Sequence, residues 1–332
     1  MTKSNLRLAG LFAGVGGIEL GFQKAGFMPI FANEIDVKAS ITYRLNHQQE
    51  LVTKDVTLLE SSEIPKMDVL TGGFPCQAFS VAGYQKGFKD PRGNVFWEIV
   101  RILEDKKPEI VFLENVKNLG SHDGGKTFRI ILQALESVGY YVNFDVLNSD
   151  GYGGVPQNRE RIYIVGFRSK KYARRFEFPG KLKKTPQLSD FIDFKNKVDD
   201  DFYYENKYMA KELRKSMKRM DTVYQWRRHY VRENKSGVCP TLTANMGTGG
   251  HNVPLVLTEH GIRKLTPKEC FNLMGFPKTF KLPRGMAMSH LYKQAGNAVV
   301  VPVIERIALN ILASINGEEL PSAKVESKLA LF

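Results

Sequence analysis

The first half of the chain alternates short apolar runs with segments that carry apolar side chains at helical spacing. The apolar runs predict buried strands at residues 6–12, 27–32, 51–52, 68–71 and 110–113. Residues 18–26, 94–105 and 127–138 predict helices between or after these strands, and Gly26 is a natural stop for the first of them. This alternation predicts an α/β fold with a mostly parallel, doubly wound sheet.

A further strand is predicted at residues 140–147, before the pattern changes. From Arg159 the side chains alternate between two faces like those of an antiparallel strand. Gln157, Arg159 and Arg161 are then expected on one face. A basic helix is predicted at residues 207–219.

The C-terminal part predicts two more helices. Thr266, Pro267 and Glu269 stand at the N-cap, N1 and N3 positions of a capping box, which predicts the start of a helix. An apolar helix is predicted at residues 303–315.

Charge and cysteine content narrow the class of protein. The net charge is +13, and residues 168–235 hold 20 Lys and Arg against 10 Asp and Glu, as expected of a protein that binds a phosphate backbone. Three widely spaced cysteines argue against a disulfide framework or a zinc cluster, and no metal is expected. The chain lacks an uncharged apolar run of about 18 residues, and its first residues do not resemble a signal peptide.

A glycine loop at residues 13–17 follows the first predicted strand and precedes a helix, which favours a nucleotide-like ligand. Its Gly-x-Gly-Gly spacing differs from the fingerprint of dinucleotide-binding sites, and no P-loop Lys-Ser/Thr follows. Glu34 ends the second strand, where an acid can bind ribose hydroxyls. Asp55 follows the third strand and can accept a hydrogen bond from an adenine amino group. Together these residues indicate an adenosine-type cofactor.

Cys76 stands on a proline- and glycine-rich turn after the fourth strand, either as a half-buried thiol or as a nucleophile. No histidine has an evident place beside it, which disfavours a cysteine protease. Glu114 stands at the end of the strand that follows in the chain, and we expect it at the same end of the sheet as Cys76. A thiolate that adds to C6 of cytosine, with a carboxylic acid on N3 and an arginine on O2, would activate C5 toward methylation.

Five motifs, in this order, closely resemble those of the DNA (cytosine-5)-methyltransferases, specifically the compact bacterial and phage modification enzymes. They are Phe12-Ala13-Gly14-Val15-Gly16-Gly17, Pro75-Cys76-Gln77, Glu114-Asn115-Val116, Gln157-x-Arg159-x-Arg161 and Gly296-Asn297. The resemblance covers residues 6–167 and 262–315. It implies a class I, Rossmann-like methyltransferase fold that uses S-adenosylmethionine, with a second, smaller target-recognition domain in the unmatched middle.

The resemblance also implies roles for individual residues. The catalytic set is Cys76, Glu114, Arg159 and Arg161. The residues expected around S-adenosylmethionine are Phe12, Gly14, Gly16, Gly17, Glu34, Ile35, Asp55, Val56, Pro75, Asn297 and Val299. The residues expected to bind DNA are Gln77, Ser80, Arg92, Arg227, Arg228, Thr241, Thr243, Asn245, Gly249 and Gly250.

The expected domains are a catalytic domain at residues 1–185, a target-recognition domain at 186–270, a hinge at 271–295 and a returning C-terminal helix at 296–332. The implied activity is methylation of cytosine C5 in a short double-stranded DNA site, on a base flipped out of the duplex. This activity would protect host or phage DNA from restriction. The protein is expected to be a monomer without membrane contact, in the cytoplasm of a bacterial or phage-infected cell.

Three other functions stay open at this point. A tRNA cytosine-5 methyltransferase would share the catalytic core, but the long, basic, loop-rich insert favours a duplex. A nicotinamide-binding Rossmann oxidoreductase is disfavoured by the glycine spacing, and a non-catalytic DNA-binding protein by the retention of all the motifs.

Overall fold

The structure is a computed structural model that describes residues 5–75, 95–184, 186–204, 209–227, 230–247 and 254–319. Contacts within the chain divide it into two compact units. The first unit consists of Met1–Leu147, Glu160–Gly180 and Val303–Ser327, and the second of Asn148–Arg159, Lys181–Pro302 and Lys328–Phe332. The functional domain boundaries expected from the sequence stay a prediction.

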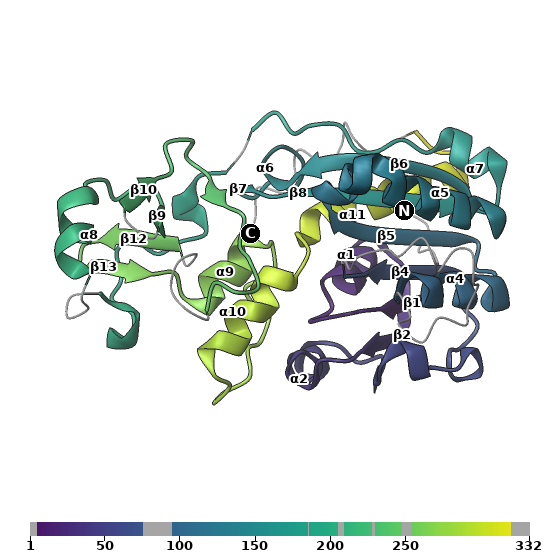
Figure 1. Cartoon of the computed structure of the whole chain (residues 1–332), viewed down its shortest axis with the longest axis horizontal. Coiled ribbons are helices and arrows are strands. Elements are labelled where there is room, and N and C mark those ends of the chain that lie inside the picture. Colours follow the sequence, from purple (N-terminus) through teal and green to yellow (C-terminus); the bar gives the residue numbers. More distant parts are fainter. Residues whose placement is uncertain are drawn as a thin grey trace. The chain divides into compact units, whose positions relative to one another are not determined.

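A seven-stranded sheet with the order β3-β2-β1-β4-β5-β8-β6 forms the centre of the first unit (Figure 1). Its strands are β1 (Arg7–Leu11), β2 (Met28–Glu34), β3 (Glu50–Thr53), β4 (Val69–Gly73), β5 (Ile110–Val116), β6 (Tyr141–Asn148) and β8 (Glu160–Phe167). The first five strands pair in parallel, and β8 runs antiparallel to β5. The predicted α/β class with a mostly parallel sheet is confirmed.

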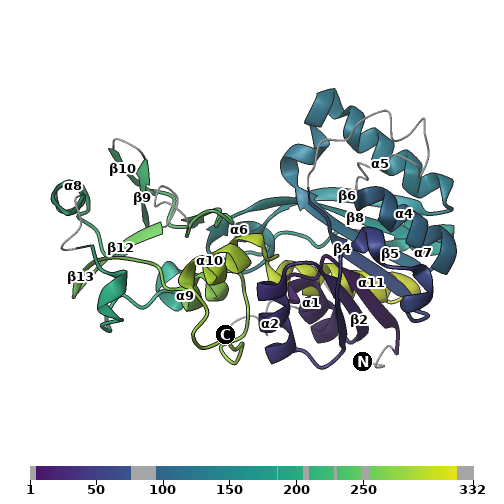
Figure 2. The ribbon, with the colours of Figure 1, turned by 60° about the horizontal axis from the view of Figure 1, so that its bottom comes forward.

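Helices cover both faces of this sheet (Figure 2). They are α1 (Gly17–Ala25), α2 (Val37–Asn46), α4 (Val95–Lys106), α5 (Lys126–Ser137), α7 (Lys170–Arg175) and α11 (Val301–Asn316). On one face, Phe31 shares a core cluster with residues of α4 and α5. On the other face, Phe22 of α1 packs edge-on against Phe112 at 5.2 Å between ring centroids. There α1 meets α11 so closely that a Cβ on Gly21 would lie 2.6 Å from Ile304.

One stretch, residues 288–316, is long and apolar enough to cross a membrane by length and composition alone. It consists of α10 (Met288–Asn297) followed by α11. Most of it is buried inside the protein, as in the core helices of soluble proteins. The burial of Ile304, Ile307 and Ile311 accounts for its apolar composition.

The second unit contains a four-stranded sheet with the order β10-β9-β12-β13. Its strands are β9 (Tyr224–Arg227), β10 (Tyr230–Glu233), β12 (Pro254–Thr258) and β13 (Gly261–Lys264), and a separate pair is formed by β7 (Gln157–Asn158) and β11 (Cys239–Pro240). Its helices are α6 (Ser149–Tyr152), α8 (Ala210–Ser216), α9 (Pro267–Leu273) and α10. Leu213, Tyr224, Trp226 and Leu255 belong to the core between α8 and the sheet.

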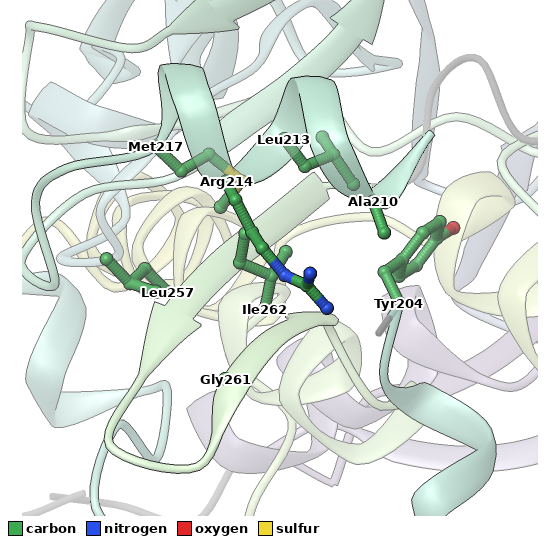
Figure 3. Close-up of a pocket in the computed structure, with 8 residues that line it drawn as sticks. All are labelled: Tyr204, Ala210, Leu213, Arg214, Met217, Leu257, Gly261 and Ile262. Atoms are coloured by element: carbon green, nitrogen blue, oxygen red, sulfur yellow. The ribbon is translucent and has the colours of Figure 1, made fainter. Parts of the chain in front are cut away.

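Short 3-10 turns join elements of both units, at Val56–Leu58, Ser61–Glu63, Lys117–Gly120, His122–Gly125, Leu188–Asp190 and Asp200–Phe202. Beside α8 lies a pocket of about 150 Å³, lined mainly by apolar side chains, with the Arg214 side chain extended across it (Figure 3). Among the residues that the structure describes, this lining holds no acid, histidine or cysteine, so these residues offer no evident chemistry.

The predicted basic helix at residues 207–219 extends too far at its C-terminal end, because α8 ends at Ser216. Met217 is extended and buried in the core, which turns the chain out of the helix. The backbone N–H groups of Lys218 and Arg219 then donate to the Tyr224 hydroxyl at 3.3 and 2.9 Å. These tertiary contacts replace the hydrogen bonds of a further helical turn.

The capping box predicted at Thr266 is confirmed. The Thr266 hydroxyl accepts a hydrogen bond from the Glu269 N–H, and Glu269 Oε2 accepts one from the Thr266 N–H at 2.8 Å. The same carboxylate binds the fully buried guanidinium of Arg263 at 2.7 and 2.8 Å. One acid therefore caps α9 and pairs with a buried charge from β13.

Candidate active site

Glu114 and Arg161 meet at the end of the first unit's sheet where its parallel strands finish. Glu114 is on β5, whose last residues pair with β8, and Arg161 lies opposite Val116 in that antiparallel pair. Arg161 Nε lies 3.1 Å from Glu114 Oε1, and both side chains are largely buried, with 14% and 11% exposed. A carboxyl group and a guanidinium are thus held together near the ends of neighbouring strands.

The strand that leads toward Cys76 ends beside this pair. Gly73, the last residue of β4, is paired with Glu114, and a Cβ on Gly73 would lie 3.4 Å from Glu114 Oε2. The Asn115 side chain donates to the Phe74 carbonyl oxygen at 2.9 Å and so fixes the chain as it leaves the strand. Pro75 is exposed at the end of this segment, and Cys76 lies outside the described residues.

Asn115 stands within the Glu114-Asn115-Val116 motif, but the sequence predicts no role for it or for Gly73. Both residues act at the end of β4. Asn115 binds the Phe74 backbone by a hydrogen bond, and Gly73 leaves room for the Glu114 carboxylate because it has no side chain. Their positions directly beside Glu114 and Phe74 in the sequence are the signal that could have indicated them.

The predicted glycine loop between β1 and α1 adopts left-handed backbone conformations. Phe12, Gly14 and Gly16 have φ values of 55°, 57° and 86°. A Cβ on Gly16 would lie 2.0 Å from the ring of His47, so only glycine fits there, whereas one on Gly14 would meet no atom of the described residues within 4 Å. Gly17 then begins α1. The loop is therefore closely supported on one side and open at Gly14.

Glu34 holds this loop from the end of β2. Its Oε2 accepts from the Gly14 N–H and its Oε1 from the Asp36 N–H, both at 2.7 Å. The neighbouring Asn33 side chain donates to the carbonyl oxygens of Val52 and Lys54, at 3.2 and 2.8 Å. Each carboxylate oxygen has a second acceptor position, so Glu34 can bind a ligand hydroxyl while it supports the loop.

The other predicted cofactor residues of the first unit lie on the next strand ends. Ile35 follows β2 and is 60% exposed, which is unusual for its size. Asp55 Oδ1 accepts from the N–H and the hydroxyl of Thr57, at 2.9 and 2.8 Å, and caps a short turn that contains the buried Val56. A carboxylate and an apolar surface are thus available beside the loop.

Behind the loop the core contains an acid that the sequence reasoning missed. Glu19 of α1 is 1% exposed, and its carboxyl group lies directly over Gly10 of β1. Burial, with a smaller effect from the nearby Glu34 charge, raises the pKa of Glu19 to about 8. His47 lies 3.1 Å from the Val15 carbonyl oxygen, and burial lowers its pKa. Both groups are neutral at neutral pH, and His47 supports the loop through its contact with Val15.

Arg159 makes its contacts within the second unit, on a segment separate from Arg161. It is 2% exposed, and its guanidinium donates to the carbonyl oxygens of Leu242, Gly296 and Ala298 at 2.8, 3.0 and 2.7 Å. The buried Gln157 side chain donates to the Leu273 carbonyl oxygen and accepts from the Leu242 N–H. These two side chains hold three backbone segments together.

Two predicted cofactor residues are next to the Arg159 acceptors. Asn297 lies between Gly296 and Ala298 and is exposed at the end of α10, whereas Val299 is buried. A Cβ on Gly296 would lie 2.2 Å from the Thr243 backbone, so this contact requires glycine.

Of the residues expected to bind DNA, the structure describes Arg227, Thr241, Thr243 and Asn245, all in the second unit. Gln77, Ser80, Arg92, Arg228, Gly249 and Gly250 lie outside the described residues. Arg227 Nη2 donates to Gln225 Oε1 at 2.9 Å, and the Thr243 hydroxyl donates to Asn245 Oδ1 at 2.7 Å. In the described ranges, no group of three or more His, Cys, Asp or Glu side chains could hold a metal ion.

Comparisons with known proteins identify relatives over nearly the whole chain. Residues 6–313 match the family model of the C-5 cytosine-specific DNA methylases. The chain is 55% identical over 314 residues to the type II methyltransferase M.Bsp6I of Bacillus sp. (strain RFL6), covering 93% of this chain and 99% of that protein. It is 40% identical to the type II methyltransferase M.HaeII of Haemophilus aegyptius over 308 residues, covering 92% of each protein.

Two solved structures have the same fold at low sequence identity. A DNMT2 mutant from Spodoptera frugiperda has a TM-score of 0.72 at 21% identity, covering 93% of this chain and all of that one. The methyltransferase EhMeth of Entamoeba histolytica has a TM-score of 0.71 at 17% identity, covering 95% of this chain and 98% of that one.

Proposed function

The chain belongs to the C-5 cytosine-specific DNA methylase family, and we propose that it methylates C5 of a cytosine within one specific short sequence of double-stranded DNA. It is a DNA (cytosine-5-)-methyltransferase of the type II restriction-modification kind, like its relatives. The observation that carries the proposed chemistry is the Glu114–Arg161 pair beside the strand that leads to Cys76.

In the proposed reaction, the Cys76 thiolate adds to C6 of the target cytosine. The Glu114 carboxylic acid hydrogen-bonds N3 and the exocyclic amine, and Arg161 contacts O2, so that the negative charge passed into the ring is stabilised. C5 then takes up the methyl group, which leaves S-adenosylhomocysteine. A water molecule accepts the C5 proton, and the C6–sulfur bond breaks to restore the thiolate and the aromatic ring. The short distance between Arg161 and Glu114 supports this division of roles, because each fixes the orientation of the other.

S-adenosylmethionine is the proposed cofactor, and it supplies an electrophilic methyl group. The described residues fit an adenosine-type ligand: the loop is open at Gly14, Glu34 has acceptor positions left, and Ile35 presents an exposed apolar side chain. We propose that Phe12, Gly16, Gly17, Asp55, Val56, Pro75, Asn297 and Val299 complete this site. No metal is part of the proposal.

The proposed substrate is a cytosine flipped out of the duplex, because C6 can be attacked only from the face of the ring. The basic second unit supports binding to a phosphate backbone. We propose that the protein acts as a monomer in the cytoplasm, without membrane contact, and protects host or phage DNA from restriction. Arg159 is proposed to position the segments that carry Thr243 and Asn297.

The test is to incubate the protein with S-adenosylmethionine and unmodified genomic DNA and to sequence the methylated cytosines. The wild-type protein should methylate one short motif, and Cys76→Ala should methylate none while still binding that motif. Cys239→Ala is the matched control: Cys239 is fully buried, burial raises the pKa of its thiol, and activity should persist. Full activity of Cys76→Ala would refute the proposed nucleophile.

Two further assays separate the rival functions. Methyl transfer to duplex DNA and to tRNA, measured side by side, should favour the duplex. Titration should detect binding of S-adenosylhomocysteine and no comparable binding of NAD, whereas the reverse would favour a nicotinamide-dependent enzyme.

A further inference from the structure

The hairpin of β9 and β10 has one apolar and one polar face. Tyr224 and Trp226 of β9 and Val231 of β10 belong to the core of the second unit or pack against it. Residues directly opposite in an antiparallel pair share a face, and Arg227 pairs with Tyr230 while Gln225 pairs with Arg232. The outer face therefore carries two arginines, an amide and a tyrosine that is 58% exposed. Such a combination suits contact with nucleic acid.

This outer face forms part of a pocket of about 320 Å³ within the second unit. The hairpin contributes Gln225, Arg227 and Arg232, and the other walls are Asn158, Asn234, Pro240, Thr241 and Thr243. The volume falls in the range of about 300–1,000 Å³ that is usual for ligand pockets. The described residues of its lining include two cations and no carboxylate, so they favour a ligand rich in hydrogen-bond acceptors.

Several lining side chains are already fixed by hydrogen bonds. Thr241 donates its hydroxyl to the Asn158 carbonyl oxygen at 2.6 Å, and Thr243 donates to Asn245 at 2.7 Å. With their single protons used, both hydroxyls can offer a ligand only acceptor lone pairs. Arg227 is oriented by its bond to Gln225 at 2.9 Å.

Arg232 differs from these side chains. It is exposed, and its side chain has no hydrogen-bond or ion-pair partner in the part of the chain that the structure describes. Its guanidinium can therefore present a planar pair of N–H donors to a ligand.

We propose that this pocket reads a G·C base pair through the major groove, with Arg232 as the guanine contact. In that groove guanine presents two acceptors, O6 and N7, and its paired cytosine presents an amino donor. The arginines match the guanine acceptors, and the fixed Thr241 and Thr243 oxygens match the cytosine donor. A phosphate group offers acceptors alone, so it would leave these hydroxyl acceptors without a use.

The inference rests on the proposed function, because it needs DNA as the substrate. The experiment begins with the methylated motif found by sequencing. In a set of otherwise identical duplexes, each guanine of the motif is replaced in turn by 7-deazaguanine, which lacks the N7 acceptor. Equilibrium binding by fluorescence anisotropy and kcat/KM are measured for the wild-type protein, Arg232→Ala and Arg232→Lys.

We expect Arg232→Ala to weaken cognate binding and kcat/KM by about 10- to 100-fold, the usual size of a bidentate arginine–guanine contact. At one guanine position, 7-deazaguanine should weaken binding by the wild-type protein and should have no further effect in Arg232→Ala. Arg232→Lys should lose most of this discrimination although it keeps the charge. Arg219→Ala is the matched control, because Arg219 is an exposed arginine of the same unit that pairs with Asp221 at 2.8 Å and Glu233 at 3.4 Å.

Two results would overturn the inference. One is an unchanged 7-deazaguanine penalty at every position in Arg232→Ala. The other is a uniform loss on all sequences with a shallower salt dependence, which would indicate a phosphate contact. Failure of the proposed function has a different signature, namely no methyl transfer by the wild-type protein on any duplex. The bound motif is then selected from a pool of random duplexes, and the same binding measurements on that motif test the pocket.

Discussion

Replacing Arg159 by lysine separates a positioning role from a direct role in the reaction. The guanidinium spreads its donors over three carbonyl oxygens, with Nη1 on Leu242 and Nη2 on Gly296 and Ala298. A lysine keeps the positive charge, but its single ammonium group cannot reach all these acceptors from one place. At least two buried hydrogen bonds are therefore lost.

The expected cost follows from the burial of this site. Arg159 is only 2% exposed, so carbonyl groups that lose their donor gain no full compensation from water. Each buried group left unpaired costs about 1–3 kcal/mol, so the loss of two such bonds in Arg159→Lys should lower the free energy of unfolding by about 2–6 kcal/mol. Since domains are stable by about 5–15 kcal/mol, the variant should fold and remain measurable.

The kinetic result should differ from that of a catalytic residue. Gly296 and Ala298 flank Asn297, which is proposed to lie at the cofactor, so Arg159→Lys should raise KM for S-adenosylmethionine more than it lowers kcat. Arg161→Lys is the matched control two residues away, and it should lower kcat with little change in stability. Urea denaturation and initial-rate kinetics measure both effects. A stable Arg159→Lys protein with a large loss of kcat and an unchanged KM would refute the positioning role.

Three further predictions concern individual acids. Burial raises the pKa of Glu19 from 4.5 to about 8, so the folded protein holds a proton that the unfolded chain releases. The free energy of unfolding therefore falls as pH rises from about 4.5 to about 8, by up to about 5 kcal/mol. Glu19→Gln removes this loss, and urea denaturation should show a variant-minus-wild-type difference that grows between pH 5 and pH 8; a constant difference would contradict it. Glu269→Ala leaves the buried Arg263 charge without its partner and should cost about 3–5 kcal/mol in thermal or urea unfolding, whereas a loss below about 1 kcal/mol would show that water reaches Arg263. Glu114→Gln retains the shape but offers N3 only an amide N–H, which is a far weaker acid than a carboxylic acid, so kcat should fall about 100-fold or more with cofactor binding unchanged, and near-normal turnover would exclude the acid role.

The strand ends and the caps could be predicted from local patterns in the sequence. The glycine loop, the end of β2 at Glu34 and the capping box at Thr266 each depend on residues close together in the chain. These features are set by backbone geometry that only certain residues adopt, so the sequence signal is direct.

Features set by distant contacts could not be predicted in this way. Arg159 and Arg161 lie two residues apart, with the expected alternation. Arg159 nevertheless bonds to residues 83 to 139 positions away, whereas Arg161 pairs with Glu114. The early end of α8 depends on the Tyr224 hydroxyl, and the buried Glu19 depends on the absence of a side chain at Gly10. Such contacts become visible only when the strands are assembled.

The most direct test of the proposed mechanism is to trap its covalent intermediate. A duplex that carries 5-fluorocytosine at the target position is incubated with the protein and S-adenosylmethionine, and the product is digested and analysed by mass spectrometry. Fluorine at C5 cannot leave as the proton does, so the C6–sulfur bond should persist, with the modified base on the peptide that contains Cys76. Turnover of the natural duplex without any trapped complex, or a base attached to a different residue, would contradict the account.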